Sequence, residues 1–284
     1  MKPETVCTVV FSPTGTSKKI AAAVARGIAS RAGEDPAEAA ALKTIDLTHA
    51  AAQSATLPAD TVAVIAAPVY GGHVAPTAVK RLETLRGAGT PAVIIAVYGN
   101  RAFEKAAAEL AELASRQGFV PVAAAAFVGE HSYSTPETPV AAGRPDAQDL
   151  ARAAEFGAAV REKLAAGTPA PVDAAKLKDV RTPLVPMLRF IRFVAGYRRR
   201  QKRNPAVYLP ACDADRCTHC GRCAAVCPTQ AIARGDEVHT DPARCIRCCA
   251  CVKGCPVGAR SFHTPFATAL ARSFTRRKPP VTLL

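Results

Sequence analysis

The sequence has no tryptophan and only two methionines, and aromatic residues make up 5% of its 284 residues. It also lacks a long hydrophobic run. The most apolar stretch, residues 184–194, is interrupted by Arg189 and Arg192 and is well short of the roughly 20 residues that span a bilayer. No signal-peptide pattern follows Met1–Glu4. The sequence therefore predicts no transmembrane segment, and we expect a cytoplasmic location.

Cysteine is missing from a long part of the chain. Of 11 cysteines, ten lie after position 211 and the other is Cys7. A secreted disulfide scaffold would spread its cysteines along the chain, so this clustering predicts a local site instead. With 49% hydrophobic and 21% charged residues, the composition excludes disorder of the whole chain. The length fits two unequal domains.

Acidic residues are scarce in the second half of the chain. Residues 1–170 are neutral overall, whereas residues 171–204 and 205–284 carry net charges of +8 and +6 and together account for the formal +14. Basic segments attract nucleic acid, anionic lipid or acidic proteins. No aromatic-rich platform accompanies the basic residues, so nucleic acid is not expected as a partner.

Residues 1–166 predict strands that alternate with helices, which is the pattern of a parallel sheet covered on both faces. In such open sheets, ligands bind beyond the carboxyl ends of the strands. The residues after each strand are therefore the candidates for a binding site. Apolar runs predict five strands, at 6–11, 44–47, 61–66, 92–97 and 120–128, and helical spacing predicts helices at 18–32, 76–85, 101–117 and 147–165.

A loop rich in hydroxyl groups follows the first strand and leads into a predicted helix. Its hydroxyls and backbone N–H groups would form a phosphate cradle, because a helix N-terminus favours anions. The loop has neither a GxxxxGK[ST] nor a GxGxxG pattern, which disfavours a triphosphate loop and a dinucleotide fold. A helix cap without a ligand is the alternative. The candidate residues are Ser12, Thr14, Gly15, Thr16 and Ser17.

The next strands bring aromatic rings and glycines to the same edge of the sheet. A flat heteroaromatic ligand needs an aromatic face for stacking, and glycines where the backbone comes close. After the fifth strand, His131 could contact the ligand or move a proton, with a polar loop as the alternative. The two strand ends are Pro68-Val69-Tyr70-Gly71-Gly72 and Tyr98-Gly99-Asn100-Arg101.

These loops resemble the FMN-binding loops of flavodoxins. The loop Ser12–Ser17 is similar to the flavodoxin phosphate loop, and segments 68–72 and 98–101 look like the two loops that hold the isoalloxazine ring. The resemblance covers residues 4–166 and implies an α/β flavodoxin-like fold, a doubly wound five-stranded parallel sheet that binds FMN. It also implies that Gly71 or Gly72 lies near N5 of the flavin. Many flavodoxins are strongly acidic, so this neutral region implies a different partner surface.

A basic connector follows the predicted sheet domain. Proline and lysine punctuate residues 167–186, which is typical of a linker. Beyond it, Leu188, Ile191 and Val194 or Ala195 share one face of a predicted short amphipathic helix. The helix would pack between the domains or lie on a membrane surface. The basic run at 198–203 is expected to be solvated, with docking of a protein partner and weak contact with anionic lipid as alternatives.

Eight cysteines fall in two copies of one spacing, C-x2-C-x2-C-x3-C-P. In proteins with this run, three thiolates surround one 4Fe-4S cluster and the fourth binds the other cluster. Structural zinc gives no reason for the third cysteine or for the proline of each copy. The sequence therefore predicts one cluster on Cys217, Cys220, Cys223 and Cys255, and a second on Cys245, Cys248, Cys251 and Cys227.

The region from about Tyr208 to Phe262 resembles bacterial two-cluster ferredoxins, which implies low-potential one-electron transfer. Oxidised clusters of this kind carry roughly −2 each, so much of the local basic charge would be compensated internally. Cys7 is expected in the core and Cys249 as a buried thiol, and nothing supports a role for Cys212. Basic residues beside the ligands could raise the cluster potentials or be exposed; they are Arg216, Arg222, Arg244, Arg247 and Lys253.

The chain as a whole resembles flavodoxin-ferredoxin fusion proteins, which occur mainly in anaerobes. The expected domains are a flavodoxin-like FMN domain at 1–166, a basic linker at 167–206, a small α+β ferredoxin domain with two 4Fe-4S clusters at 207–264 and a basic tail at 265–284. The resemblance implies an electron-transfer flavoprotein that links a ferredoxin-like donor to a reductase partner. Whether it acts as a monomer or a homodimer is open.

Two other functions stay open at this point. A flavin-dependent oxidoreductase would act directly on a small molecule, with His131, Glu130 or Tyr70 as proton donor. A redox-responsive regulator would change the binding of residues 198–203 to nucleic acid or protein with the state of the clusters.

Overall fold

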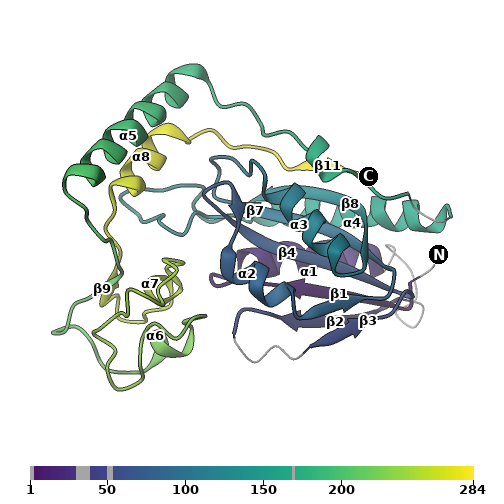
Figure 1. Ribbon diagram of the computed structural model, residues 1–284, viewed down its shortest axis with the longest axis horizontal. Helices are drawn as coiled ribbons and strands as arrows, with labels where there is room; N and C mark the ends of the chain where they lie inside the picture. The colour runs from purple at the N-terminus through teal and green to yellow at the C-terminus, as the bar shows by residue number, and fades with distance from the viewer. Residues whose placement is uncertain (1–2, 30–38, 50–53, 168–169) are drawn as a thin grey trace. The chain divides into compact units, whose positions relative to one another are not determined.

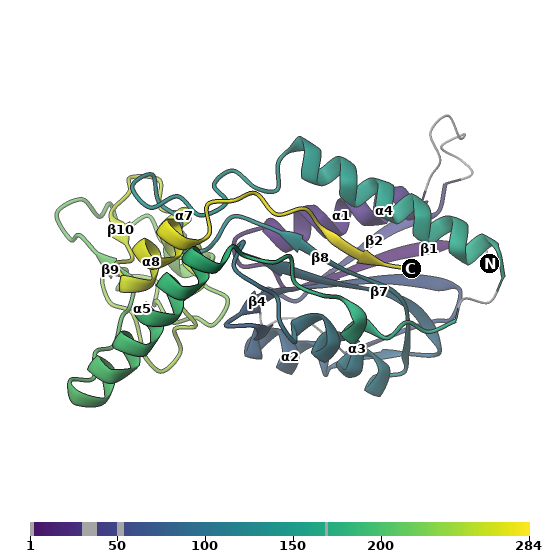
Figure 2. The same cartoon turned by 90° about the horizontal axis from the view of Figure 1, so that it is seen from above.

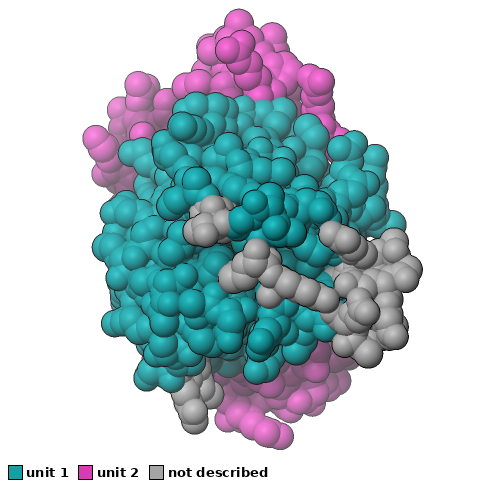
Figure 3. All heavy atoms as spheres, turned by 90° about the vertical axis from the view of Figure 1, so that its right-hand side faces the viewer, with its two compact units in different colours: residues 1–130, 143–180, 278–284 teal, residues 131–142, 181–277 magenta. Residues whose placement is uncertain are grey.

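The chain forms two compact units, which are coloured separately in Figure 3. The computed structural model describes residues 3–29, 39–49, 54–167 and 170–284. The first unit comprises Met1–Glu130, Gly143–Val180 and Lys278–Leu284, and the second comprises His131–Ala142 and Arg181–Arg277. The units are therefore not successive segments, because the chain passes from one to the other four times.

A mostly parallel sheet forms the centre of the first unit (Figure 1). Five of its strands pair in parallel, in the order β8-β7-β4-β1-β2. The five strands expected from the apolar runs are present, but they belong to a seven-stranded sheet, because β5 (His73–Val74) and β11 (Val281–Leu283) add antiparallel pairings. The parallel strands are β1 Thr5–Val10, β2 Ala41–Asp46, β4 Thr61–Tyr70, β7 Thr90–Tyr98 and β8 Phe119–Val128.

Helices cover both faces of this sheet (Figure 2). α1 (Thr16–Ala29) and α4 (Ala147–Ala165) lie side by side on one face, and α2 (Pro76–Leu82) and α3 (Ala106–Arg116) cover the other. Gly157 lets α1 and α4 approach closely, because a Cβ there would clash with the Val24 carbonyl oxygen. The expected helix at 18–32 is observed as α1, and its last three residues lie outside the described part of the chain.

Short elements complete the first unit. β3 (Ala55–Leu57) and β6 (Leu85–Gly87) form a separate parallel pair, and a 3-10 turn, η2, spans Ala174–Lys176. One core cluster lies between the sheet and the α1–α4 pair and consists mostly of valine, isoleucine and alanine, with the rings of Phe127 and Phe156 in contact.

The C-terminal residues are a structural part of both units. β11 pairs with β8, with Thr282 opposite Ala125, and α8 (Pro265–Ser273) belongs to the second unit. The sequence predicted a basic tail at 265–284, whereas the structure has α8 and β11 in these residues. β11 pairs with the backbone groups at the edge of β8, which would otherwise be unpaired. Lys278, which precedes β11, is 3% exposed and donates from Nζ to the Arg101 carbonyl oxygen at 2.5 Å.

A buried ion pair fixes this C-terminal segment. Arg144 donates from Nε and Nη2 to the two carboxylate oxygens of Asp149 at 2.8 and 2.5 Å, and both side chains are buried. Arg144 Nη1 also donates to the Lys278 carbonyl oxygen at 3.1 Å. One guanidinium therefore joins the beginning of α4 to the residues that lead into β11.

Helices α5 (Leu184–Arg203) and α8 pack through aromatic rings in the second unit. Phe190 lies 5.0 Å from Phe274, and Phe193 lies 5.0 Å from Phe266, between ring centroids. Of the face predicted to pack, Val194 lies against this aromatic cluster, whereas Leu188 and Ile191 are exposed. Aromatic rings bury more area than aliphatic side chains, which explains why they occupy the packed face. Among the described residues, no helix is long and apolar enough to cross a membrane.

The rest of the second unit has little regular structure. It contains the short helices α6 (Arg222–Ala225) and α7 (Ala250–Lys253) and the two-stranded sheet of β9 (Ala211–Cys212) and β10 (Arg260–Ser261).

The segment 131–142 leaves the sheet after β8 and packs within the second unit. Val140 is buried in the aromatic cluster of α5 and α8. Tyr133 lies against Phe262 with ring centroids 5.0 Å apart, and Lys253 Nζ donates to the Ser134 carbonyl oxygen at 3.4 Å. The expected boundary at 166 assigns this segment to the first domain, whereas Tyr133 and Val140 find their apolar partners in the second unit.

Replacing Arg144 by Met should lower the free energy of unfolding of the first unit by about 3–5 kcal/mol, because the change removes the guanidinium that compensates the buried Asp149 carboxylate. Urea unfolding followed by far-UV circular dichroism measures the loss. The matched control is Arg116→Met, which breaks the exposed Glu112–Arg116 pair of α3 and should cost less than about 1 kcal/mol. Equal losses in the two variants would contradict the structural role of Arg144.

Candidate metal centres and nucleotide loop

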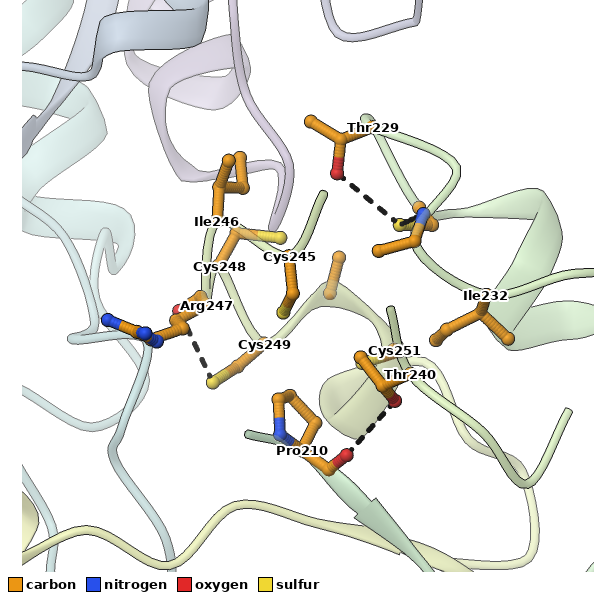
Figure 4. Close-up of a pocket in the computed structure, with 13 residues that line it drawn as sticks. Pro210, Thr229, Ile232, Thr240, Cys245, Ile246, Arg247, Cys248, Cys249 and Cys251 are labelled. Atoms are coloured by element: carbon orange, nitrogen blue, oxygen red, sulfur yellow. Dashed lines mark hydrogen bonds between the residues drawn. The ribbon is translucent and has the colours of Figure 1, made fainter. Parts of the chain in front are cut away.

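Two cavities in the second unit are lined by cysteines. Each has about 300 Å³ that protein atoms do not fill, a volume that includes solvent at its open side. Cys212 additionally lines the cavity that contains Cys217, and Cys249 additionally lines the cavity that contains Cys245. The structure thus brings the motif cysteines together in two sets, each with a fourth cysteine from the other motif. The first cavity is lined by Cys217, Cys220, Cys223 and Cys255, and the second by Cys245, Cys248, Cys251 and Cys227 (Figure 4).

The cysteine region is a structural repeat, with a first half at 212–232 and a second half at 240–260. The two motifs begin 28 residues apart, at Cys217 and Cys245. In each half a backbone N–H donates to the sulfur of the last motif cysteine at 3.2 Å, from Ala231 and from Ala259. Left-handed backbone also occurs at equivalent positions, which are His219 and Arg247, Gly221 and Cys249, and Gln230 and Gly258.

The repeat distinguishes the additional cysteines from the motif cysteines. Cys249 stands where the first half has Gly221, and Cys212 stands where the second half has Thr240. The Cys249 thiol donates to the Arg247 carbonyl oxygen at 3.6 Å, and Figure 4 shows its sulfur turned toward Arg247. A sulfur that only one half carries is not needed for the arrangement that both halves share.

Burial dominates the electrostatics of the second cavity. It raises the pKa of Cys248 to about 12 and that of Cys251 to about 11. Because the thiolate is the form that binds metal, cationic iron is needed to compensate the charge. Cys255 in the first cavity differs: burial acts against it, but the backbone N–H groups of residues 257–260 together lower the pKa of its thiol.

The donor set fits a cluster better than a single ion. Among the described residues, no group of three or more His, Cys, Asp or Glu side chains is arranged to hold a metal ion. A zinc ion binds four ligands directly at about 2.0–2.3 Å, whereas a 4Fe-4S cluster places iron and inorganic sulfide between the thiolates. Cysteines arranged around an open space suit the second case.

The basic residues expected beside the ligands are all exposed; they are Arg216, Arg222, Arg244, Arg247 and Lys253. A different cation, Arg260, is 3% exposed and lines the first cavity. Sequence reasoning missed it because it lies outside the cysteine spacing. The available signal is the repeat itself, since the equivalent position in the first half is the apolar Ile232.

The match to known families falls on this region. Residues 209–261 match the family model of the 4Fe-4S dicluster domain. The matched residues include both cysteine motifs, so the expectation of a ferredoxin-type domain in the C-terminal part of the chain is confirmed. A domain of this kind supports iron-sulfur electron transfer and implies redox partners. No curated protein matches the chain.

In the first unit, the hydroxyl-rich loop lies between β1 and α1. Gly15 has φ of +82°, and its N–H donates to the Ser12 carbonyl oxygen at 3.0 Å, while the Lys18 N–H donates to Ser12 Oγ at 3.0 Å. Thr14, Gly15 and Thr16 are half-buried. The Ser17 hydroxyl is buried without a hydrogen-bond partner among the described residues. A Cβ at Gly15 would meet no atom within 4 Å, so this helix N-terminus offers space for a phosphate.

The second loop is a tight hairpin between β4 and β5. Gly71 and Gly72 have φ of +63° and +95°, and Tyr70 pairs with His73. Positive φ at both central residues is required in this kind of turn, so the turn itself accounts for the two glycines. Pro68, Val69 and Tyr70 are half-buried, which leaves part of the Tyr70 ring accessible.

The third loop differs from its expected role. The Tyr98 ring is 2% exposed and packs edge-on against Phe103 with centroids 5.5 Å apart. Burial raises the pKa of its hydroxyl, with a further contribution from Asp179. Tyr98 thus offers no aromatic face in this structure, because Phe103 already covers it. Asn100 is buried at φ +64°, Gly99 is half-buried, and Arg101 Nη1 pairs with Glu104 at 2.5 Å.

His131 lies in the second unit. Its Nδ1 accepts a hydrogen bond from the Tyr133 N–H at 3.0 Å, and the two rings lie 4.8 Å apart. These contacts fit the alternative that His131 is a hydrogen-bonded residue of a polar loop.

Replacing Cys248 by Ala should reduce the iron content from about eight to about four atoms per chain, because each cluster contains four irons. Replacing its neighbour Cys249 by Gly, the residue of the first half, should leave about eight. Iron and sulfide analysis of anaerobically purified protein measures both. Loss of iron in Cys249→Gly would show that Cys249 is a ligand.

Proposed function

We propose that the chain is an electron-transfer protein that carries two 4Fe-4S clusters and one FMN. The observation that carries the proposal is the pair of cavities, each with four motif cysteines of which one comes from the other half of the repeat. The match to the 4Fe-4S dicluster domain supports the same assignment. The proposed ligands are Cys217, Cys220, Cys223 and Cys255 for one cluster, and Cys245, Cys248, Cys251 and Cys227 for the other.

The FMN part of the proposal rests on the first unit. Counted along the chain, its five parallel strands have the order 2-1-3-4-5, which is the order of flavodoxin. The loop at 12–17 would hold the phosphate through its N–H groups, with the buried Ser17 hydroxyl as a further donor. The partly accessible Tyr70, followed by Gly71 and Gly72, would face the flavin ring. We leave Tyr98 out of the proposed contact surface because its ring is buried.

The two kinds of cofactor suit a protein that links redox partners. Bound FMN supplies two one-electron steps, and the clusters supply one-electron exchange. Covalent linkage in one chain raises the effective concentration of each site at the other. We propose a ferredoxin-like donor and a reductase as partners.

The first test is an anaerobic redox titration of the purified protein, with iron, sulfide and FMN measured. About eight iron atoms and one FMN per chain, with absorbance and EPR signals that respond to reduction, are expected. Four or fewer irons would overturn the two-cluster assignment. Eight irons without flavin would overturn the FMN part alone.

Replacing Gly15 by Leu should weaken FMN binding at least about tenfold, which is about 1.4 kcal/mol, because the side chain would project into the proposed phosphate space. The control is Gly89→Leu: Gly89 has φ of +73° and equally open surroundings, but it precedes β7 and therefore lies at the other edge of the sheet. Both variants carry the same backbone strain. Titration of apoprotein with FMN, followed by quenching of flavin fluorescence, compares them, and equal affinities would refute the placement.

A further inference from the structure

Arg260 is a buried charge held mainly by uncharged groups. It begins β10 and is 3% exposed. Its Nη1 donates to the Glu237 carbonyl oxygen, and its Nη2 donates to the Pro210 carbonyl oxygen and to Thr240 Oγ1. Its Nε is buried and has no hydrogen-bond partner among the described residues. A buried N–H normally has an acceptor, so this N–H indicates a contact with a group that the polypeptide does not supply.

The guanidinium lies where it can act on both cysteine sets. Its side chain lines the first cavity, and two of the residues it contacts, Pro210 and Thr240, line the second.

The repeat makes this buried charge an asymmetry between the two sites, each of which also has one exposed arginine in its lining, Arg222 in the first cavity and Arg247 in the second. Arg260 and Ile232 occupy the same place, each following the turn after the last motif cysteine. Ile232 lines the second cavity, is 4% exposed and packs with Cys223 and Cys251. At this place the first cavity therefore has a full positive charge and the second has an aliphatic side chain.

One opposite charge also faces the first cavity. The Glu237 side chain lines it and is buried, accepts from the Gly235 N–H at 2.9 Å and pairs with His219 Nδ1 at 3.0 Å. These contacts engage both carboxylate oxygens of Glu237. Arg216, beside Cys217, is exposed, and its Nη2 donates to the Val257 carbonyl oxygen at 2.9 Å. Solvent therefore screens its charge more than that of the buried Arg260.

We propose that Arg260 sets the reduction potential of the cluster bound by Cys217, Cys220, Cys223 and Cys255 above that of the other cluster, with its Nε–H donating to a sulfur of that cluster. This inference rests on the proposed function. A cluster gains one negative charge when it accepts an electron from the ferredoxin-like donor, which loses one. Nearby positive charge and hydrogen bonds to sulfur stabilise the reduced form and raise the potential. An electron that enters at either cluster then resides on the one beside Arg260.

The experiment reads each cluster alone. A Cys248→Ala background retains the cluster beside Arg260, and a Cys220→Ala background retains the other. Potentials are measured by EPR-monitored titration with dithionite. Before any change at Arg260, the Cys248→Ala protein should have the higher potential, and the opposite order would overturn the proposal. If the parent chain does not hold about eight irons, the proposed function itself has failed.

Two neutral variants then test the residue. Arg260→Gln keeps amide donors for the carbonyl acceptors, and Arg260→Met removes them. In the Cys248→Ala background, either should lower the ratio of reduced to oxidised cluster at a fixed potential at least about tenfold, which is about 59 mV for one electron. The fall in the Cys220→Ala background should be smaller. Arg216→Gln is the matched control, and its effect should be small and disappear at high salt.

The results separate the possible explanations. A selective fall that persists at high salt supports a buried charge acting on the nearer cluster. Equal shifts in the two backgrounds, or a shift no larger than that of Arg216→Gln, would overturn the proposal. If neither neutral variant assembles its clusters, the order of the two parental potentials decides the question.

Discussion

The second unit depends on two sets of four cysteines, and each set combines residues from both halves of its repeat. Each cavity takes three motif cysteines from one half and the fourth from the other, so neither half contains a complete set. The regular elements around them, α6, α7, β9 and β10, have only two to four residues each, too few to be stable alone. Bonds across the cavities would provide the order that such short elements cannot. Folding of this region is therefore expected to be coupled to metal binding.

The two units are also joined by the path of the chain. β11 follows the whole second unit in sequence but belongs to the sheet of the first, while the segment 131–142 leaves that sheet and packs on α5 and α8. A cut at residue 166 would therefore remove the strand that covers the edge of β8. The part that remained would still contain Val140, without the aromatic cluster in which it is buried. Each unit therefore consists of chain segments that are far apart in the sequence, unlike two domains joined end to end.

Local patterns in the sequence identify most of the sheet and the cysteine sets. Continuous apolar runs locate β1, β4, β7 and β8, because buried parallel strands are nearly continuous hydrophobic segments. The spacing of the cysteine motifs reflects a turn that both halves of the repeat share. Tertiary packing decides the rest. No local rule indicates that Phe103 covers Tyr98, that β11 returns to β8, or that Phe190 rather than Ile191 faces α8. Local patterns do not identify Arg260 as a buried residue for the same reason, since its burial depends on carbonyl groups from distant positions.

Those carbonyl groups explain how a repeat can hold a charge in one half and an isoleucine in the other. Ile232 needs only apolar neighbours, whereas a buried guanidinium needs acceptors for its N–H groups. Pro210 and Glu237, which supply two of them, lie outside both halves of the repeat, and Thr240 has Cys212 as its counterpart. The surroundings of the two equivalent positions therefore differ, although the cysteine turns are the same. Two sites built on one backbone pattern can then differ in electrostatics without any change in their ligands.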